Sequence, residues 1–199
     1  MSALKKLVIL FVEGETEKEF YDELIKYYRV NSKTPVISCK VYNVKGISRF
    51  ENKVSSRLKL DIIPKHPNCE FKVVCCYDTD VFELAQKPPI NWNIVEKKIN
   101  ELGINEFYEI KATRMIEDWF LKDISGLCNY LNIEIPKKID GKTGFEKIKN
   151  LFKKGKKPKV YQKGSNSHKF IPSLNILLIR NAIIKELTSL EKALGVKLE

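Results

Sequence analysis

The sequence lacks the features by which several common classes of protein are known. It has two histidines and no Cys-x-x-Cys pair, so the clustered ligands of a zinc site are missing. It has no Gly-x-x-x-x-Gly-Lys-Ser/Thr motif, which excludes a P-loop ATPase within this chain. The longest apolar run, Leu7 to Val12, is far shorter than the roughly 20 residues that cross a bilayer. We therefore expect neither a zinc module nor an ATPase nor a membrane partner.

The five cysteines are an odd number and show no pairing by spacing. Cys75 and Cys76 lie inside an apolar run, where cysteine behaves as a small hydrophobic residue. This usage is typical of a reducing compartment and predicts a cytoplasmic protein with free thiols.

With 199 residues, 43% of them hydrophobic and 31% charged, the chain suits a well-packed globular domain. Apolar runs predict strands, and apolar residues spaced three or four apart predict helices between them. Strands alternating with helices indicate an α/β fold, with a mostly parallel sheet and helices on both faces. The strands are expected at 7–12, 36–44, 71–77 and 106–112, and the helices at 16–28, 46–60, 93–102, 114–121, 125–131, 144–152 and 174–194.

The formal net charge is +11, and much of the excess lies in one segment. From Lys137 to Lys169 there are twelve lysines and two acids. A concentrated positive charge favours polyanionic partners, because each neutralised phosphate releases counterions, although lysine-rich surfaces also serve solubility. We expect a catalytic domain over residues 1–135, with the basic segment and C-terminal helices of residues 136–199 packed on it as a helical extension.

Acidic residues follow two of the predicted strands directly. Glu13-Gly14 ends the first strand, and Asp78-Thr79-Asp80 ends the third. Ligands of such sheets bind beyond the carboxyl ends of the strands, and carboxylates there suit Mg²⁺, which prefers oxygen donors. Taken alone, Glu-Gly is commonly a turn and Asp-x-Asp a helix cap. Two acidic groups that each follow a buried strand are a more specific signal for a metal site.

The segments Phe11-Val-Glu-Gly-Glu-Thr-Glu17 and Tyr77-Asp-Thr-Asp80 resemble the two defining motifs of the Toprim domain. The form Glu-Gly-x-Thr-Glu is most similar to Toprim modules of the overcoming-lysogenization-defect (OLD) nucleases and to small Toprim-like proteins of bacterial defence systems. The resemblance covers about residues 5 to 125 and implies a Toprim-like Rossmannoid fold. The sequence departs from several Toprim proteins where Val81-Phe82-Glu83, rather than an early glycine, follows Asp80.

The resemblance also implies roles for individual residues. Glu13 would be a metal ligand or a general acid/base, and Glu17 a second acid one helical turn later. Asp78 and Asp80 would be paired ligands of Mg²⁺ or Mn²⁺. Glu117, in Met115-Ile-Glu-Asp-Trp-Phe-Leu121, matches an acid that related proteins carry on a helix near this point, although it also suits the solvent side of an amphipathic helix.

OLD-type nucleases use a lysine after the Asp-x-Asp motif to stabilise charge in the transition state. Lys163 and Lys169 are both candidates, and the spacing does not choose between them. The lysines with an interleaved aromatic residue suit a segment that binds a nucleic-acid backbone and stacks on a base. The candidate contact residues are Arg114, Lys153, Lys154, Lys156, Lys157, Lys159 and Tyr161.

These features predict a Mg²⁺-dependent nuclease acting on DNA or RNA, in a setting such as phage defence. Two rivals use the same residues: nucleotidyl or phosphoryl transfer on a small substrate, and a nucleic-acid-binding module without turnover. OLD-type modules are usually fused to an ATPase, so the resemblance implies an ATPase partner in a separate chain. The apolar C-terminal helix suits either core packing or a homodimer seam.

Overall fold

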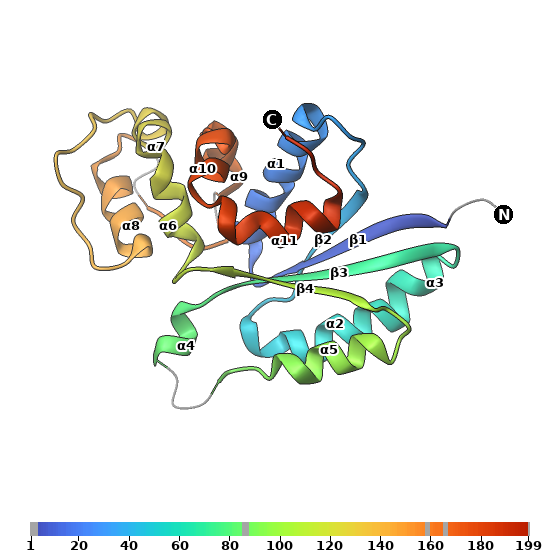
Figure 1. Cartoon of the computed structure of the whole chain (residues 1–199). Helices are drawn as coiled ribbons and strands as arrows, with labels where there is room; N and C mark the ends of the chain where they lie inside the picture. The colour runs from blue at the N-terminus through green and yellow to red at the C-terminus, as the bar shows by residue number, and fades with distance from the viewer. Residues whose placement is uncertain (1–3, 85–87, 158–159, 165–166, 199) are drawn as a thin grey trace.

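The chain folds around a single parallel β-sheet. Its structure is a computed structural model that describes residues 4–84, 88–157, 160–164 and 167–198. The sheet has the order β2-β1-β3-β4, and all three neighbouring pairs are parallel. The strands are β1 (Lys5–Val12), β2 (Ser38–Asn43), β3 (Cys69–Asp78) and β4 (Glu106–Ala112). The predicted α/β class with a parallel sheet is confirmed (Figure 1).

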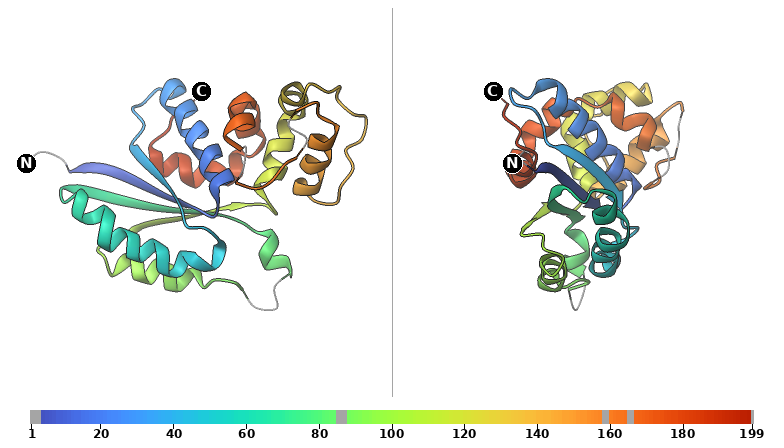
Figure 2. Two further views of the ribbon diagram at one scale, coloured as in Figure 1. Left: turned by 180° about the vertical axis from the view of Figure 1, so that it is seen from behind. Right: turned by 90° about the vertical axis from the view of Figure 1, so that its right-hand side faces the viewer.

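Helices cover both faces of the sheet, as predicted (Figures 1 and 2). One face, called here the α1 face, is covered by helices from both ends of the chain. They are α1 (Glu15–Asn31), α6 (Ile116–Phe120), α7 (Ile124–Leu131), α8 (Gly144–Lys154), α9 (Ser167–Phe170), α10 (Ile176–Ala182) and α11 (Ile184–Leu194). The other, the α2 face, is covered by α2 (Phe50–Arg57), α3 (Ile63–Lys65) and α5 (Trp92–Asn100), while α4 (Asp80–Leu84) follows β3 at the edge.

Alternation along β1 divides the core in two. Val8, Leu10 and Val12 are buried in the α1-face core, whereas Leu7, Ile9 and Phe11 are buried in the α2-face core. Successive strand residues point to opposite faces, so a strand that is apolar throughout must be covered on both. This explains why the run is uninterrupted up to Glu13.

The predicted continuous helix over 174–194 is wrong, because the chain bends at Ile183 (φ −120°, ψ 24°) between α10 and α11. The bend brings Arg180 onto Glu191, with Nε–Oε1 at 2.7 Å and Nη2–Oε2 at 2.8 Å. The Tyr28 hydroxyl donates to the same carboxylate at 2.8 Å, which fastens both helices to α1. Leu187 is core, whereas Leu177, Leu178 and Ile184 are exposed.

The basic segment and the C-terminal helices share the α1-face core with the preceding residues. Ile148 of α8, Phe170 of α9 and Leu187 of α11 belong to the same buried cluster as Trp119 of α6. All five cysteines are free thiols. No helix in the described part of the chain is long and apolar enough to span a bilayer.

Candidate active site

Two acids predicted from the sequence stand at the carboxyl edge of the sheet. Glu13 follows β1, and Asp78 is the last residue of the neighbouring strand β3. Glu17 lies in the first turn of α1 and is 5% exposed, so its carboxylate is turned inward. Gly14 makes room for it, since a Cβ at that position would lie 2.7 Å from Glu17 Oε2.

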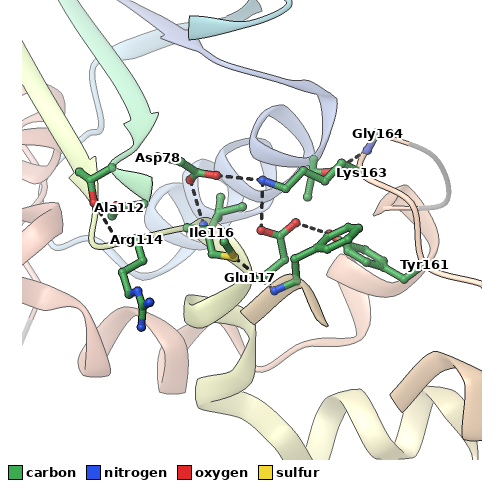
Figure 3. Close-up of polar contacts among 12 residues, drawn as sticks. Asp78, Ala112, Arg114, Ile116, Glu117, Tyr161, Lys163 and Gly164 are labelled. Atoms are coloured by element: carbon green, nitrogen blue, oxygen red, sulfur yellow. Dashed lines mark hydrogen bonds and ion pairs between the residues drawn. The ribbon is translucent and has the colours of Figure 1, made fainter. Parts of the chain in front are cut away.

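Lys163 enters this group of acids from the basic segment (Figure 3). Its Nζ lies 3.0 Å from Asp78 Oδ2 and 3.3 Å from Glu117 Oε2. Glu117 is fully buried and comes from α6, while the Lys163 side chain is 42% exposed. The structure thus joins the ends of two strands, the start of a helix and a lysine from a distant part of the sequence. We call Glu13, Glu17, Asp78 and Glu117 the acid cluster.

Two further hydrogen bonds hold the Lys163 segment in place. The Tyr161 hydroxyl donates to Glu117 Oε1 at 2.9 Å. The Gly164 backbone N–H donates to Thr16 Oγ1 at 2.7 Å, which ties the segment to the start of α1. Lys163 is therefore fixed on both sides, and its position over the acid cluster does not depend on its own ion pairs alone.

Asp78 is fixed in a similar way. Its Oδ1 accepts a hydrogen bond from the backbone N–H of Ile116 at 2.9 Å, and its Oδ2 faces Lys163. Because Ile116 precedes Glu117, the same contact sets the position of α6 relative to β3. The two acids that meet Lys163 are therefore held at a defined separation.

The surroundings of the acid cluster disfavour the charged forms of its carboxyl groups. Burial raises the pKa of Asp78 to about 8 and that of Glu17 to about 7, although the Lys163 ammonium group opposes both shifts. Burial also raises the pKa of Glu13. For Lys163, burial favours the neutral amine, yet the surrounding carboxylates, Asp78 foremost, outweigh it and raise the pKa. A second cation would be stabilised at such a site.

Carboxylate oxygens fit a hard divalent cation, and Glu13 offers one that is available. Its Oε2 is buried and has no hydrogen-bond partner among the described residues, so it is available to bind a cation or to accept a proton. The spacing of the acids differs from that of a metal-ligand set, because they surround the Lys163 ammonium group. In the described part of the chain, no three Asp, Glu, His or Cys side chains form a ready metal-binding set.

The other predicted site residues lie around this centre. Asp80 is the first residue of α4 and is partly exposed, and its backbone N–H donates to the Arg114 carbonyl oxygen at 2.8 Å. Arg114 is exposed just before α6. Lys169 is exposed on α9 and, over the described ranges, forms no ion pair with the acid cluster, so the structure brings Lys163 rather than Lys169 to the acids.

The lysines predicted to bind nucleic acid at the end of α8 and after it are exposed. They are Lys153, Lys154, Lys156 and Lys157, while Lys159 lies outside the described residues. The predicted stacking role of Tyr161 is wrong, because its side chain is 1% exposed and its ring packs between Phe152 and Phe170. Its apolar neighbours bury the ring, and its hydroxyl serves Glu117.

Thr16 and Gly164 are contact residues that the sequence reasoning did not single out. The Thr16 hydroxyl accepts from the backbone N–H of Gly164, a residue 148 positions away. The sole local signal was its place between Glu13 and Glu17, which made it part of a motif without giving its partner.

Comparisons with known proteins add a distant likeness in three-dimensional structure. No family model matches the chain, and no match was found among curated proteins. The chain is similar to two structures of the C-terminal region of the Xanthomonas campestris pv. campestris OLD protein, at 15% sequence identity in both cases. Each similarity covers 94% of this chain, and it covers 95% of the first structure and 93% of the second, with TM-scores of 0.42 and 0.45. The C-terminal region of the Burkholderia pseudomallei OLD protein is similar at 15% identity, with 88% and 98% coverage and a TM-score of 0.33. We base the functional proposal on the chain's own side chains rather than on likenesses of this degree.

Proposed function

We propose that the protein is a metal-dependent nuclease that hydrolyses phosphodiester bonds. The observation that carries this proposal is the convergence of four acids and one lysine at the carboxyl edge of the sheet. The acids supply oxygen donors for Mg²⁺ or Mn²⁺, and the lysine supplies a positive charge beside them. Both kinds of group stabilise the charge that develops in phosphodiester hydrolysis.

Each group has a role that follows from its surroundings. Asp78, Glu17 and Glu117 would hold the cation, which when bound neutralises charge on the phosphate and lowers the pKa of water. Glu13, with a raised pKa and an unpaired oxygen, accepts a proton from the attacking water. The water oxygen bonds to phosphorus as the bond to the leaving oxygen breaks. The leaving oxygen takes up a proton from solvent, and Glu13 releases the proton it accepted to solvent.

Lys163 stands where negative charge develops. Its ammonium group is already beside the carboxylates, and partial exposure lets it reach a phosphate oxygen of a bound substrate. Its raised pKa keeps it charged at neutral pH. We expect it to stabilise the pentacoordinate phosphorus electrostatically.

The positive charge of the chain supports the proposal that the substrate is a nucleic acid. The net charge is +11, and exposed lysines lie on α8 and immediately after it, in the segment that also delivers Lys163. Phosphate neutralisation by such residues gives affinity that falls with salt. A small nucleotide substrate would not require these lysines.

The test is cleavage of single- and double-stranded DNA and RNA with Mg²⁺ or Mn²⁺, with and without EDTA. Glu13→Gln removes the proton acceptor and should lower the rate by about 10²-fold or more. Glu70→Gln is the matched control, because Glu70 lies exposed at the opposite end of β3 and pairs loosely with Lys6 at 3.6 Å. The control should cleave as the wild type does.

The remaining outcomes separate the rivals. Cleavage that survives EDTA and Glu13→Gln would overturn the proposal. Turnover of nucleotides without cleavage of polymers would favour transfer on a small substrate. Salt-sensitive binding without turnover under any metal would favour a binding module.

A further inference from the structure

The four strands end in a symmetrical pattern of charge. Of the inner strands, β1 is followed directly by Glu13 and β3 ends at Asp78. Each outer strand is followed two residues later by a basic residue, Lys45 after β2 and Arg114 after β4. Read across the sheet in its order β2-β1-β3-β4, the carboxyl edge runs cation, acid, acid, cation.

The two basic residues share an unusual backbone conformation. Lys45 and Arg114 both have φ of +66°, and the only other described non-glycine residue with positive φ is Asn132, at the end of α7. Long side chains are disfavoured in this region, where glycine would fit at no steric cost. Such conformations gather at functional sites, so the two side chains merit a functional explanation.

Both side chains are exposed, and neither forms an ion pair within the described ranges. Lys45 lines a cavity of about 330 Å³ together with Glu13, Glu17 and Lys163. Arg114 lies on the other side, between the end of β4 and the start of α6. Figure 3 shows the Arg114 guanidinium group directed away from Lys163. The two cations therefore flank the acid cluster instead of neutralising it.

The separation of the flanking residues limits the ligand. Three steps between neighbouring strands, each about 4.8 Å, separate the outer strands β2 and β4, which Lys45 and Arg114 follow, by about 14 Å across the sheet. A ligand that meets both must carry negative charge on both sides of the acid cluster. A polynucleotide does so, because it carries one negative charge per nucleotide along its backbone, whereas a lone phosphate ester does not.

We propose that one polynucleotide strand lies across the carboxyl edge, with backbone phosphates at Lys45 and Arg114 and an intervening phosphate over the acid cluster. This inference rests on the proposed function and specifies its substrate as a polymer bound on both sides of the cleaved bond. A single strand is favoured over a duplex, because Asp78 and Glu117 are buried and a flexible backbone can approach recessed groups. Beyond Arg114, Lys147 continues the basic surface onto α8.

The experiment measures binding of a fluorescent single-stranded oligonucleotide by anisotropy in EDTA, over a range of salt concentrations. Lys45→Gly and Arg114→Gly remove the charge and suit the positive φ, so both should fold. Each should weaken binding about two- to fivefold, the size of an exposed ion pair. Each should also reduce the slope of log affinity against log salt by about 0.7.

Two controls make the result specific. Lys59→Ala removes one exposed charge on the α2 face, between α2 and α3, and should bind as the wild type does. Lys45→Arg keeps the charge and should restore most of the affinity.

In competition, the unlabelled single strand should displace the probe better than a duplex or a mononucleotide.

The outcomes distinguish this inference from the proposed function. If the wild type cleaves nucleic acid but both glycine variants bind as it does, the inference is overturned and the nuclease proposal stands. If both variants weaken binding in EDTA but no metal supports cleavage, the inference holds and the nuclease proposal fails. Equal competition by duplex or mononucleotide would overturn the single-strand path.

Discussion

The two faces of the sheet differ in what they bury. On the α2 face, the core of the described residues is apolar and aromatic, with Phe50 and Tyr77 buried and the partly buried Trp92 packed against both. On the α1 face lie all the described residues whose buried side chains are charged, together with Thr16. They are Glu17, Asp78, Glu117, Asp123 and Arg180. One face is therefore built for packing alone, while the other combines packing with a charged site.

Burial of charge has an energetic consequence for the α1 face. Asp123 and Arg180 have hydrogen-bond partners for their charges. Asp123 accepts hydrogen bonds from the backbone N–H groups of Gly126 and Asn175, and Arg180 pairs with Glu191. The acid cluster has only Lys163 as its counter-charge among the described residues. Like charges held together without full compensation destabilise a fold, and such a site is retained for function.

The largest expected effect on stability comes from loss of packing in the α2-face core, and it tests whether the two faces differ in role. Phe50 is fully buried and its ring centroid lies 5.3 Å from that of Trp92. Phe50→Ala should lower the free energy of unfolding by about 3–5 kcal/mol, measured by urea denaturation. Activity per folded molecule should stay at the wild-type value. A loss of activity in the folded fraction would show that the two faces are not separate in function.

The next effect concerns the pH dependence of stability on the α1 face. A carboxyl group whose pKa is raised in the folded state binds protons more readily there than in the unfolded chain. Its contribution to stability is therefore lost as pH rises from about 4, its unfolded pKa, through the folded value. With Asp78 at about 8 and Glu17 at about 7, the wild type should lose stability across this range.

Asp78→Asn should flatten that loss, because the amide oxygen can still accept from Ile116 while the charge is gone. We expect the Tm above pH 8 to rise by a few degrees, about 2–4 °C for each kcal/mol, with little change at pH 5. Differential scanning fluorimetry across pH measures this, with Glu70→Gln as the control. An equal pH slope in wild type and Asp78→Asn would contradict the excess of charge in the acid cluster.

Features of the fold and the site that depend on neighbouring residues could be predicted from the sequence, whereas contacts between distant residues could not. The strands and the acids at their ends follow from local patterns, since an apolar run that stops at Glu13 or Asp78 marks both a strand and its edge. Glu17 follows from its spacing on the same helix. For Glu117 the sequence left two interpretations, and only the packing of α6 against β3 turns it inward.

Contacts across long sequence separations could not be predicted. Lys163 lies 85 residues from Asp78, and no spacing rule separated it from Lys169. Tyr161 is surrounded in sequence by lysine and glycine, so it suggested an exposed aromatic, whereas three phenylalanines of α8 and α9 enclose its ring. The bend at Ile183 likewise brings Arg180 onto Glu191, a contact that no local pattern of the sequence indicated.

The smallest change, the removal of one hydroxyl group, tests whether the α1 face uses a core residue to position its site. Tyr161→Phe keeps the buried ring and removes only the hydroxyl that donates to Glu117 Oε1. A hydrogen bond to a charged group contributes about 1.5–3 kcal/mol, so kcat should fall about tenfold or more if the position of Glu117 matters, with KM little changed. Phe170→Leu alters packing against the same ring without touching the hydrogen bond and should affect stability alone. Steady-state kinetics on both variants separate positioning from packing. If Phe170→Leu lowers kcat as much as Tyr161→Phe does, the hydroxyl has no special role and the α1-face core acts on the site through its packing.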